Sequence, residues 1–278
     1  MNASVNWILF FITCILIIDL SISGCSTIDN DNTENPLHTL EETQEVWTPA
    51  PNSSYQIQFT GELDLSVEAE VFELDAFDTD SSVIEELHEA GKYVICYINA
   101  GAFEDWRPDA DQYPDEIIGK AYAEWPGENW LDIRQTDLLM PILEARLDLC
   151  VSKALDAVEF DNVDGWQNDT GFVLSSSDQL AFNRLLAEAA HQRGLAAGLK
   201  NDPDQITDLE SWFDFAVVES CFSQGWCEQT QPFIDSGKPV FAIEYSSING
   251  YCSGSKAPGI TLLQKRRDLD AWRKTCQE

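Results

Sequence analysis

Residues Leu155–Trp166 read Leu-Asp-Ala-Val-Glu-Phe-Asp-Asn-Val-Asp-Gly-Trp. A short apolar run ends in acidic residues and a Gly-Trp turn, which is typical of a buried strand that delivers carboxylates to a pocket at its carboxyl end. Because side chains alternate along a strand, Glu159 and Asp161 share one face, and apolar residues occupy the other. Burying charge is costly unless the charge is paired or used. The stretch therefore indicates a functional pocket, or else a buried ion pair or a strand-end Asp that caps the next helix.

Strand-like and helix-like runs alternate through the rest of the chain. Expected strands cover residues 55–59, 70–75, 92–98, 157–161, 195–200, 215–219, 239–244 and 260–263, and expected helices cover residues 81–90, 138–154, 178–192 and 268–275. A long segment rich in Trp, Pro and Asp, residues 103–133, interrupts this rhythm. The alternation predicts an α/β fold, a single (β/α)8 TIM-type barrel, rather than an open sheet.

The first 24 residues have the features of a bacterial lipoprotein signal peptide. Residues 7–18 are apolar apart from one Thr, which is too short for a membrane span, and Ile22-Ser23-Gly24-Cys25 resembles a lipoprotein cleavage box. Residues 1–6 contain no Lys or Arg, so an uncleaved anchor or ordinary secretion stays open. We expect lipidation at Cys25, a flexible acidic tether over residues 25–45 and a (β/α)8 barrel domain over residues 46–278. The protein would then be exported and lipid-anchored at the bacterial cell envelope, or secreted.

The formal net charge of −33 comes from 49 acidic and 16 basic residues, which argues against nucleic acid as a partner. The acidity fits either a solvated surface or the steering of a cationic ligand. None of the 3 His follows an expected strand, so a His-ligated zinc site or a Ser-His-Asp triad has little support. We therefore expect no cofactor and no metal, and a monomeric protein.

Of the 8 cysteines, six follow the expected lipidation site, and an even number in an exported protein suggests disulfides. Cys221–Cys227 is the first expected pair, and Cys252–Cys276 is the second. Cys96 lies within an expected strand and Cys150 within an expected helix, so these two could be buried free thiols.

The expected strand ends are consistently polar. In chain order they supply Asp75, Asp78, Tyr97, Asn99, Asp161, Asn162, Asp164, Lys200, Asn201, Asp202, Glu219, Glu244 and Tyr245. Because barrel enzymes hold their sites at the carboxyl ends of the strands, these residues predict one pocket. Loop tryptophans, Trp166 among them, suit either stacking on sugar rings or anchoring of the loops.

Carboxylates and aromatic residues without metal-binding His suggest glycoside hydrolysis. That reaction needs one carboxyl group to protonate the leaving oxygen and a second to act as nucleophile or to activate water. Asp161 and Glu219 lie two strands apart on the same rim, and Lys200 on the strand between them could keep Asp161 ionised. An apolar run precedes Glu219, which favours this residue as the acid.

These residues belong to sequence blocks that are similar to those of a known family. The blocks are Asp75-Ala76-Phe77-Asp78-Thr79, Val94-Ile95-Cys96-Tyr97-Ile98-Asn99-Ala100-Gly101, Trp130-Leu131-Asp132-Ile133-Arg134, Val158-Glu159-Phe160-Asp161-Asn162-Val163-Asp164-Gly165, Gly198-Leu199-Lys200-Asn201 and Glu219-Ser220-Cys221-Phe222. Over Trp47–Trp272 the chain resembles glycoside hydrolase family 114, the endo-α-1,4-polygalactosaminidases. The resemblance implies a barrel, a catalytic pair at Asp161 and Glu219, and cleavage of α-1,4-linked galactosamine or N-acetylgalactosamine polymers of an exopolysaccharide. An acidic rim would attract such a polymer where its amino groups are free.

The remaining polar positions complete the expected site. The residues expected to bind substrate are Asp75, Asp78, Tyr97, Asn162, Asp164, Trp166, Lys200, Asn201, Glu244 and Tyr245. Two alternatives stay open. One is a non-catalytic carbohydrate-binding lipoprotein, and the other is a metal-dependent hydrolase that uses the oxygens of Asp75, Asp161 and Asp164.

Overall fold

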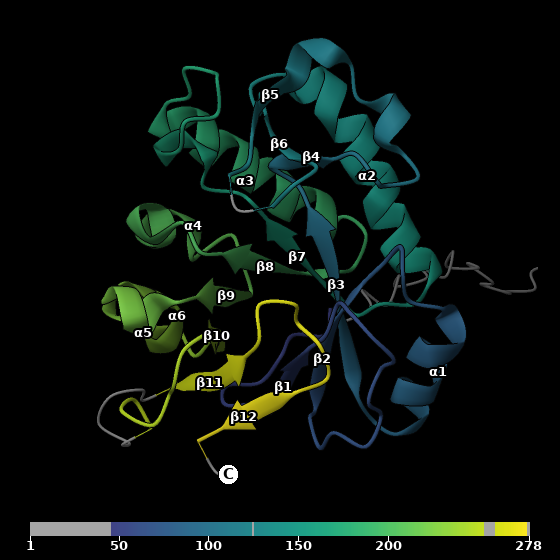
Figure 1. The fold of residues 1–278 in the computed structure, drawn as a ribbon, viewed down its shortest axis with the longest axis vertical. Helices are drawn as coiled ribbons and strands as arrows, with labels where there is room; N and C mark the ends of the chain where they lie inside the picture. Colours follow the sequence, from purple (N-terminus) through teal and green to yellow (C-terminus); the bar gives the residue numbers. More distant parts are fainter. Residues whose placement is uncertain (1–45, 124, 253–258, 277–278) are drawn as a thin grey trace, which may run out of the picture. The chain divides into compact units, whose positions relative to one another are not determined.

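The structure, a computed structural model, describes residues 46–123, 125–252 and 259–276. Figure 1 shows how the elements of this part are arranged. The expected signal peptide, the lipidation site Cys25 and the tether lie outside the described residues. Within the described residues, no helix is long and apolar enough to cross a membrane.

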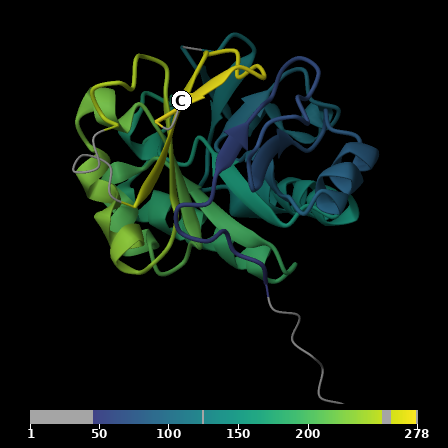
Figure 2. The same cartoon turned by 90° about the horizontal axis from the view of Figure 1, so that it is seen from below.

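Among the described residues, the main sheet has nine strands in the order β1-β2-β3-β7-β8-β9-β10-β11-β12. Their bounds are β1 Tyr55–Ile57, β2 Val71–Asp75, β3 Tyr93–Asn99, β7 Ala157–Asp161, β8 Ala196–Lys200, β9 Phe215–Glu219, β10 Val240–Glu244, β11 Ile260–Lys265 and β12 Arg273–Thr275. Every neighbouring pair from β1 to β11 is parallel, and only β12 is antiparallel to its neighbour. The sheet curves into a nearly closed barrel, which confirms the predicted α/β barrel (Figures 1 and 2).

Helices lie in the connections between successive strands from β2 to β10 and cover the outside of the sheet there (Figure 1). Their bounds are α1 Ser81–Glu89, α2 Thr136–Ser152, α3 Ser176–His191, α4 Ile206–Leu209, α5 Cys221–Gln224 and α6 Gln231–Asp235, with 3₁₀ turns at η1 Ala110–Gln112, η2 Asp115–Ile117, η3 Gly165–Gln167, η4 Pro203–Gln205 and η5 Cys227–Thr230. The start of α3 is set by a capping box, in which Ser175 and Asp178 bond each other's backbone N–H groups.

The alternation along β7 separates two layers of core. Phe160 is fully buried in the larger apolar cluster, together with helix residues such as Leu147 and Leu186. Inside the barrel, the ring of Phe215 packs in a smaller apolar cluster. A Cβ atom added at Gly198 would lie 2.3 Å from the Phe215 ring, so the glycine leaves the space that this ring fills. Burial of such a side chain stabilises the fold by roughly 1.5–3 kcal/mol.

The barrel closes through the C-terminal segment. The backbone N–H of Phe59 donates to the carbonyl of Leu269 at 2.9 Å, and Arg273 Nη1 donates to the carbonyl of Tyr55 at 2.8 Å. This segment was predicted to form a helix over residues 268–275, and that prediction is wrong. Its backbone groups instead bond the edge next to β1, and it ends in β12, which pairs with β11.

The segment between β3 and α2 forms a second, three-stranded antiparallel sheet in the order β4-β6-β5. The strands are β4 Ala102–Glu104, β5 Ile118–Ala121 and β6 Glu128–Leu131. β4 follows the carboxyl end of β3 within three residues. The insertion therefore stands over the barrel rim, where the polar strand ends lie (Figure 1).

The described residues contain three disulfides. Cys221–Cys227 and Cys252–Cys276 confirm the two expected pairs. The third, Cys96–Cys150, joins β3 to α2, so the expectation of free thiols at these positions is wrong. The two cysteines are 54 residues apart in sequence, and the packing of the helix on the sheet brings their Cα atoms to 6.0 Å.

Candidate active site

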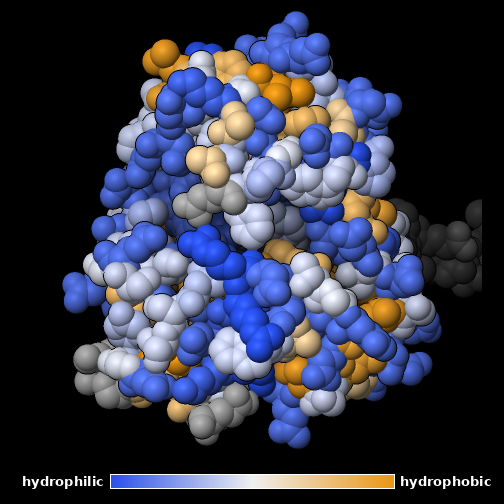
Figure 3. Space-filling view, viewed as in Figure 1, coloured by the Kyte–Doolittle hydropathy of each residue, from blue (hydrophilic) through white to orange (hydrophobic). Residues whose placement is uncertain are grey.

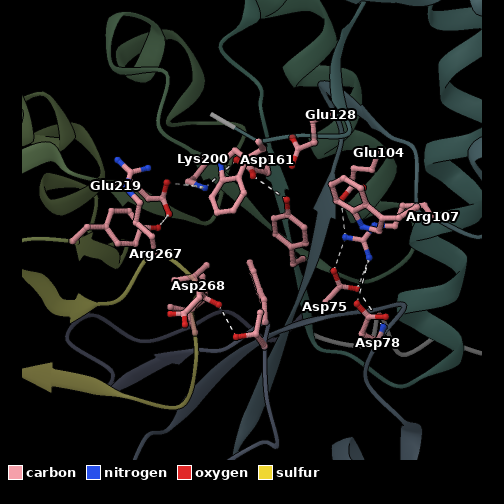
Figure 4. A pocket seen from close by; sticks show the side chains of 18 residues that line it. Asp75, Asp78, Glu104, Arg107, Glu128, Asp161, Lys200, Glu219, Arg267 and Asp268 are labelled. Carbon is pink, nitrogen blue, oxygen red and sulfur yellow. Dashed lines mark hydrogen bonds and ion pairs between the residues drawn. The ribbon is translucent and has the colours of Figure 1, made fainter. Parts of the chain in front are cut away.

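The neighbouring parallel strands β7, β8 and β9 end in Asp161, Lys200 and Glu219. Lys200 Nζ lies 2.9 Å from Asp161 Oδ1 and 3.7 Å from Glu219 Oε2, so one ammonium group bridges the two carboxyl groups (Figure 4). Burial lowers the pKa of Lys200, but the nearby carboxylates raise it more, and the pKa lies well above its ordinary value. Lys200 is therefore a fixed positive charge at the centre of the site.

Several donors hold the carboxyl group of Asp161. The hydroxyl of Tyr97 donates to Oδ2 at 3.0 Å, and the backbone N–H of Asn162 donates to Oδ1 at 2.8 Å. Asn162 has a φ of 60°, and its backbone comes very close to Gly101. A Cβ atom at Gly101 would lie 1.7 Å from the carbonyl oxygen of Asn162, so only glycine permits this approach. The loop after β7 is thereby fixed against the loop after β3.

Glu219 lies in a polar setting, although the apolar residues before it suggested otherwise. The hydroxyl of Tyr245 donates to Glu219 Oε1, and the backbone N–H of Glu219 donates to Asn201 Oδ1 at 2.8 Å. The apolar residues of β9 alternate between the barrel interior and the helices, so they do not surround the carboxyl group. The Glu219 side chain is 27% exposed, which keeps it accessible to a ligand.

Two further carboxyl groups, those of Glu73 and Glu159, are fully buried beneath this site. Glu159 Oε1 lies 3.7 Å from Lys200 Nζ, and the hydroxyl of Tyr55 donates to Glu73 Oε2. Burial raises the pKa of Glu73 to about 7, although Tyr55 and Lys200 lower it. Burial also raises the pKa of Glu159 well above its ordinary value. The two carboxyl groups beneath the site therefore lose their protons less readily than exposed glutamates do.

A pocket of about 400 Å³ lies on one side of Asp161 and Glu219. Its lining comes from β1–β3, the insertion, the carboxyl ends of β7–β10 and the C-terminal segment. The lining residues include Asp75, Asp78, Tyr97, Glu104, Trp106, Arg107, Trp125, Glu128, Lys200, Tyr245, Arg267 and Asp268. A second pocket of about 360 Å³ adjoins Glu219 on the other side and is lined from the loops after β7, β8 and β9. A small pocket of about 60 Å³ lies between them. Hydrophilic side chains cover much of this face (Figure 3).

Arg107 organises the wall of the larger pocket. Its Nη2 atom lies 2.6 Å from Asp75 Oδ2 and 2.8 Å from Glu104 Oε1, and its Nη1 atom lies 3.8 Å from Asp78 Oδ2. Burial lowers the pKa of Arg107, but the hydrogen bonds that it donates to Glu104 and Asp75 raise the pKa above its ordinary value. Asp75 thus lines the pocket, as its position at a strand end predicted, and much of its charge is offset by this arginine.

The other residues expected at the site divide into two groups. Asn162, Asp164 and Asn201 line the small central pocket. Burial, and after it the charge of Asp161, raises the pKa of Asp164 to about 6. Tyr245 lines both larger pockets.

Trp166 and Glu244 are not among the residues that line the three pockets around Asp161 and Glu219. The indole N–H of Trp166 donates to Asp202 Oδ1 at 3.3 Å. Glu244 is fully buried, and its Oε1 accepts the backbone N–H of Phe222 at 2.8 Å, at the start of α5. In the described residues these two side chains support loops around the site.

The sequence did not point to several residues of the larger pocket. Glu104, Arg107 and Glu128 come from the insertion, and Arg267 and Asp268 come from the segment that closes the barrel. None follows a strand of the expected barrel. The available signal was the insertion's richness in Trp and Asp, which indicates a binding segment without saying which side chains face the pocket.

The alternative of a metal centre finds no support in the placement of its three expected ligands. Asp75 is paired with Arg107, and Asp161 is paired with Lys200. Those oxygens already face protein cations. Among the described residues, no group of three or more His, Cys, Asp and Glu side chains could hold a metal ion.

The sequence profile of glycoside-hydrolase family GH114 matches residues 36–278. This chain belongs to family GH114. A comparison with curated proteins gives no match. The family assignment makes the chain a glycosidase, and the paired carboxyl groups at the rim fit that class of enzyme.

Solved structures agree with the GH114 assignment. The crystal structure of Aspergillus fumigatus Ega3 in complex with galactosamine is 36% identical, covers 84% of this chain and 99% of its own, and superposes with a TM-score of 0.80. The glycoside hydrolase domain of PelA from Pseudomonas aeruginosa is 15% identical over 81% of this chain and 98% of its own, with a TM-score of 0.64. The second similarity concerns the fold alone.

Proposed function

We propose that this GH114 glycosidase cleaves α-1,4-linked galactosamine and N-acetylgalactosamine polymers, with Asp161 as nucleophile and Glu219 as acid and base. The observation that carries the proposal is the bridging of these two carboxyl groups by Lys200. The substrate class rests on the similarity to Ega3, whose structure contains galactosamine. A two-carboxylate reaction needs no cofactor.

In the first step, Asp161 attacks the anomeric carbon while Glu219 gives its proton to the glycosidic oxygen. The attacking carboxylate must be held in place, and Tyr97, Asn162 and Lys200 hold it through both oxygens. The bond to the leaving sugar breaks, and the remaining sugar becomes an ester of Asp161.

In the second step, Glu219 takes a proton from water, and the water oxygen displaces Asp161 from the anomeric carbon. Esterification removes the negative charge of Asp161. The ammonium of Lys200 then interacts chiefly with Glu219, which stabilises the ionised form that a base requires.

We favour retention of anomeric configuration. One oxygen of each carboxyl group lies near a single ammonium nitrogen, at 2.9 and 3.7 Å. Such bridging suits the separation of roughly 5 Å used by retaining enzymes better than the roughly 6.5–9.5 Å of inverting ones.

The polymer would lie across both larger pockets, because Glu219 and Tyr245 line each of them. A groove that continues on both sides of the reacting bond admits the middle of a chain, so we propose endo cleavage. In the larger pocket, Trp106 and Trp125 are 51% and 42% exposed and offer faces for stacking on sugar rings.

We also propose that the protein is exported, with lipidation at Cys25 and the barrel domain beyond residue 45. The three disulfides support an oxidising compartment. Mass spectrometry of the protein from its native membrane fraction would detect the lipid on Cys25, and an unmodified cysteine in an intact N-terminus would refute the anchor.

The test of the function is product release from partly deacetylated α-1,4-galactosaminan by the full chain. Asp161→Asn and Glu219→Gln should abolish release, whereas Asp169→Asn, an exposed carboxylate paired with Lys120, should not. A chelator should have no effect, and NMR of the first product should show the α anomer. Polymer binding without cleavage by the wild type would favour a binding protein, and chelator-sensitive cleavage would favour a metal-dependent enzyme.

A further inference from the structure

Glu128 is a pocket residue that the two-carboxylate reaction does not use. It lies on β6, directly opposite Glu104 on β4, and only 7% of its surface is exposed. Its side chain lines the larger pocket next to Asp161 (Figure 4). Two carboxyl groups therefore face each other across one strand pair beside the reacting position.

The two opposed carboxyl groups have different partners. Glu104 lies 2.8 Å from Arg107 Nη2 and 3.5 Å from Arg146 Nη1. Glu128 Oε2 accepts only side-chain amides, from Asn99 at 3.2 Å and Asn162 at 3.4 Å. Within the described residues, Glu128 forms no ion pair, and its Oε1 atom accepts no hydrogen bond. A nearly buried carboxyl group thus presents one oxygen to the pocket without a cation.

Glu128 is also fixed relative to Asp161. Asn162, which donates to Glu128, follows Asp161 directly and donates its backbone N–H to that carboxylate. Asn99, the other donor, is the register partner of Asp161 on β3. The two amides that orient Glu128 therefore also border Asp161, so both carboxyl groups belong to one rigid arrangement.

The charge balance around Glu128 favours a positively charged ligand. Burial raises its pKa to about 8, with further increases from Asp161 and Glu104, whereas Asn99 and Arg107 lower it. A cation that enters the pocket would stabilise this carboxyl group further as an anion. An ammonium group of the ligand could pair with the Oε1 atom of Glu128, which accepts no hydrogen bond within the described residues.

The chemistry of amino sugars places such a group close to the reacting carbon. In a 2-amino-2-deoxy sugar, the amino group is on the carbon next to the anomeric carbon. A carboxylate that reaches the anomeric carbon, as Asp161 does in the proposed reaction, therefore has the amino nitrogen two bonds from its target. A second carboxyl group beside Asp161 is placed to meet that amino group.

We propose that Glu128 binds the free 2-ammonium group of the sugar attacked by Asp161 and so selects a de-N-acetylated sugar at that position. This inference rests on the proposed function and assigns its specificity to one residue. An N-acetylated sugar presents a neutral, bulkier amide to the same oxygen and forms no ion pair there. Polymers would then be cut where a free amine occupies this position, whatever the neighbouring sugars carry.

The experiment compares two α-1,4-galactosamine polymers, one fully de-N-acetylated and one fully N-acetylated, with the full chain. Glu128→Gln should lower kcat/KM on the deacetylated polymer by roughly tenfold to a hundredfold, the range expected for a charged hydrogen bond. It should change kcat/KM on the acetylated polymer far less. Glu116→Gln, the same change at an exposed position of the same insertion, is the matched control. It should leave the ratio of kcat/KM on the deacetylated polymer to kcat/KM on the acetylated polymer as in the wild type.

The opposite results are equally clear. If Glu128→Gln leaves the ratio of kcat/KM between the two polymers unchanged, the assignment is overturned. An equal loss of kcat/KM on both polymers would make Glu128 a residue that positions Asp161. Calorimetric binding of galactosamine and N-acetylgalactosamine, with a melting curve to verify folding, separates this inference from the proposed function. If the wild type cleaves neither polymer but binds galactosamine through Glu128, the function is wrong and the ammonium site stands. If Glu128→Gln binds galactosamine as the wild type does, the site is wrong.

Discussion

Glu159 lies 3.7 Å from Lys200 Nζ, and within the described residues neither of its carboxyl oxygens accepts a hydrogen bond. Burial raises its pKa well above the ordinary value, although Lys200 lowers it. The raised pKa biases Glu159 toward its neutral form, which has no charge to offer Lys200. The ammonium is thereby left to Asp161 and Glu219, the two groups that the proposed reaction uses.

Replacing Glu159 with Gln should therefore cost little activity. We expect kcat to stay within about threefold of the wild type, because an amide has the shape and the neutrality of a protonated carboxyl group. Steady-state kinetics on galactosaminan would test this, with Asp161→Asn as the inactive reference. A loss of about a hundredfold or more would mean that Glu159 works as an anion.

Removing the positive charge at Lys200 should have the opposite effect. In Lys200→Met, Asp161 and Glu219 face each other without a cation, so we expect kcat to fall by about a hundredfold or more. The acidic limb of the pH–rate profile should move to higher pH, since repulsion between two carboxylates favours protonation. Lys120→Met, at an exposed ion pair, is the control. A profile with an unmoved acidic limb would contradict the proposed bridging role.

The buried carboxyl groups predict a fold that is more stable in mild acid. Burial raises the pKa of Glu73 from 4.5 to about 7 and that of Glu128 from 4.5 to about 8. At a pH between 4.5 and the raised pKa of each group, the folded state binds more protons than the unfolded state. The free energy of unfolding should therefore fall as the pH rises through this range. From about pH 5 to about pH 8 we expect a loss of a few kcal/mol, since one pKa unit corresponds to about 1.4 kcal/mol.

Denaturant titration across this pH range would measure the loss. Glu73→Gln and Glu128→Gln should each flatten the pH dependence, and Glu116→Gln at an exposed position should not. Stability that rises over the same range would show that both carboxyl groups are ionised in the folded protein.

The disulfides should contribute unequally to stability. Cys96–Cys150 closes a sequence separation of 54 and Cys221–Cys227 one of 6. The loss of chain entropy in the unfolded state predicts about 4 kcal/mol for the longer loop and about 2 kcal/mol for the shorter. Paired Cys→Ala variants compared by denaturant unfolding would test the order. A larger loss from the short loop would point to native packing rather than loop closure.

The barrel and the centre of the site could be predicted from the sequence because both follow from short-range patterns. Period-two alternation in β7 separates Glu159 and Asp161 from Val158 and Phe160, and the structure keeps that separation. Parallel strands bring their carboxyl ends together, so Asp161, Lys200 and Glu219 could be expected at one rim. No contact between distant segments had to be known.

The parts that could not be predicted depend on long-range pairing. Glu128 reaches the pocket because β6 pairs with β4, and the insertion has no regular period that indicates this pairing. Cys96–Cys150 depends on how α2 packs on β3. Residues 268–275 contain a helix-like pattern, but the free edges of β1 and β11 supplied partners for their backbone groups.

The C-terminal segment closes the barrel and also lines the larger pocket. If the barrel opens locally at this closure, the larger pocket is therefore lost as well. Phe59, Arg267, Asp268 and Leu269 line the larger pocket, and Phe59 and Leu269 also bond across the closure. A ligand held in that pocket touches both sides of the closure at once. Amide hydrogen exchange along β1 and the closing segment should therefore slow when a sugar binds, since local opening and ligand release become one event.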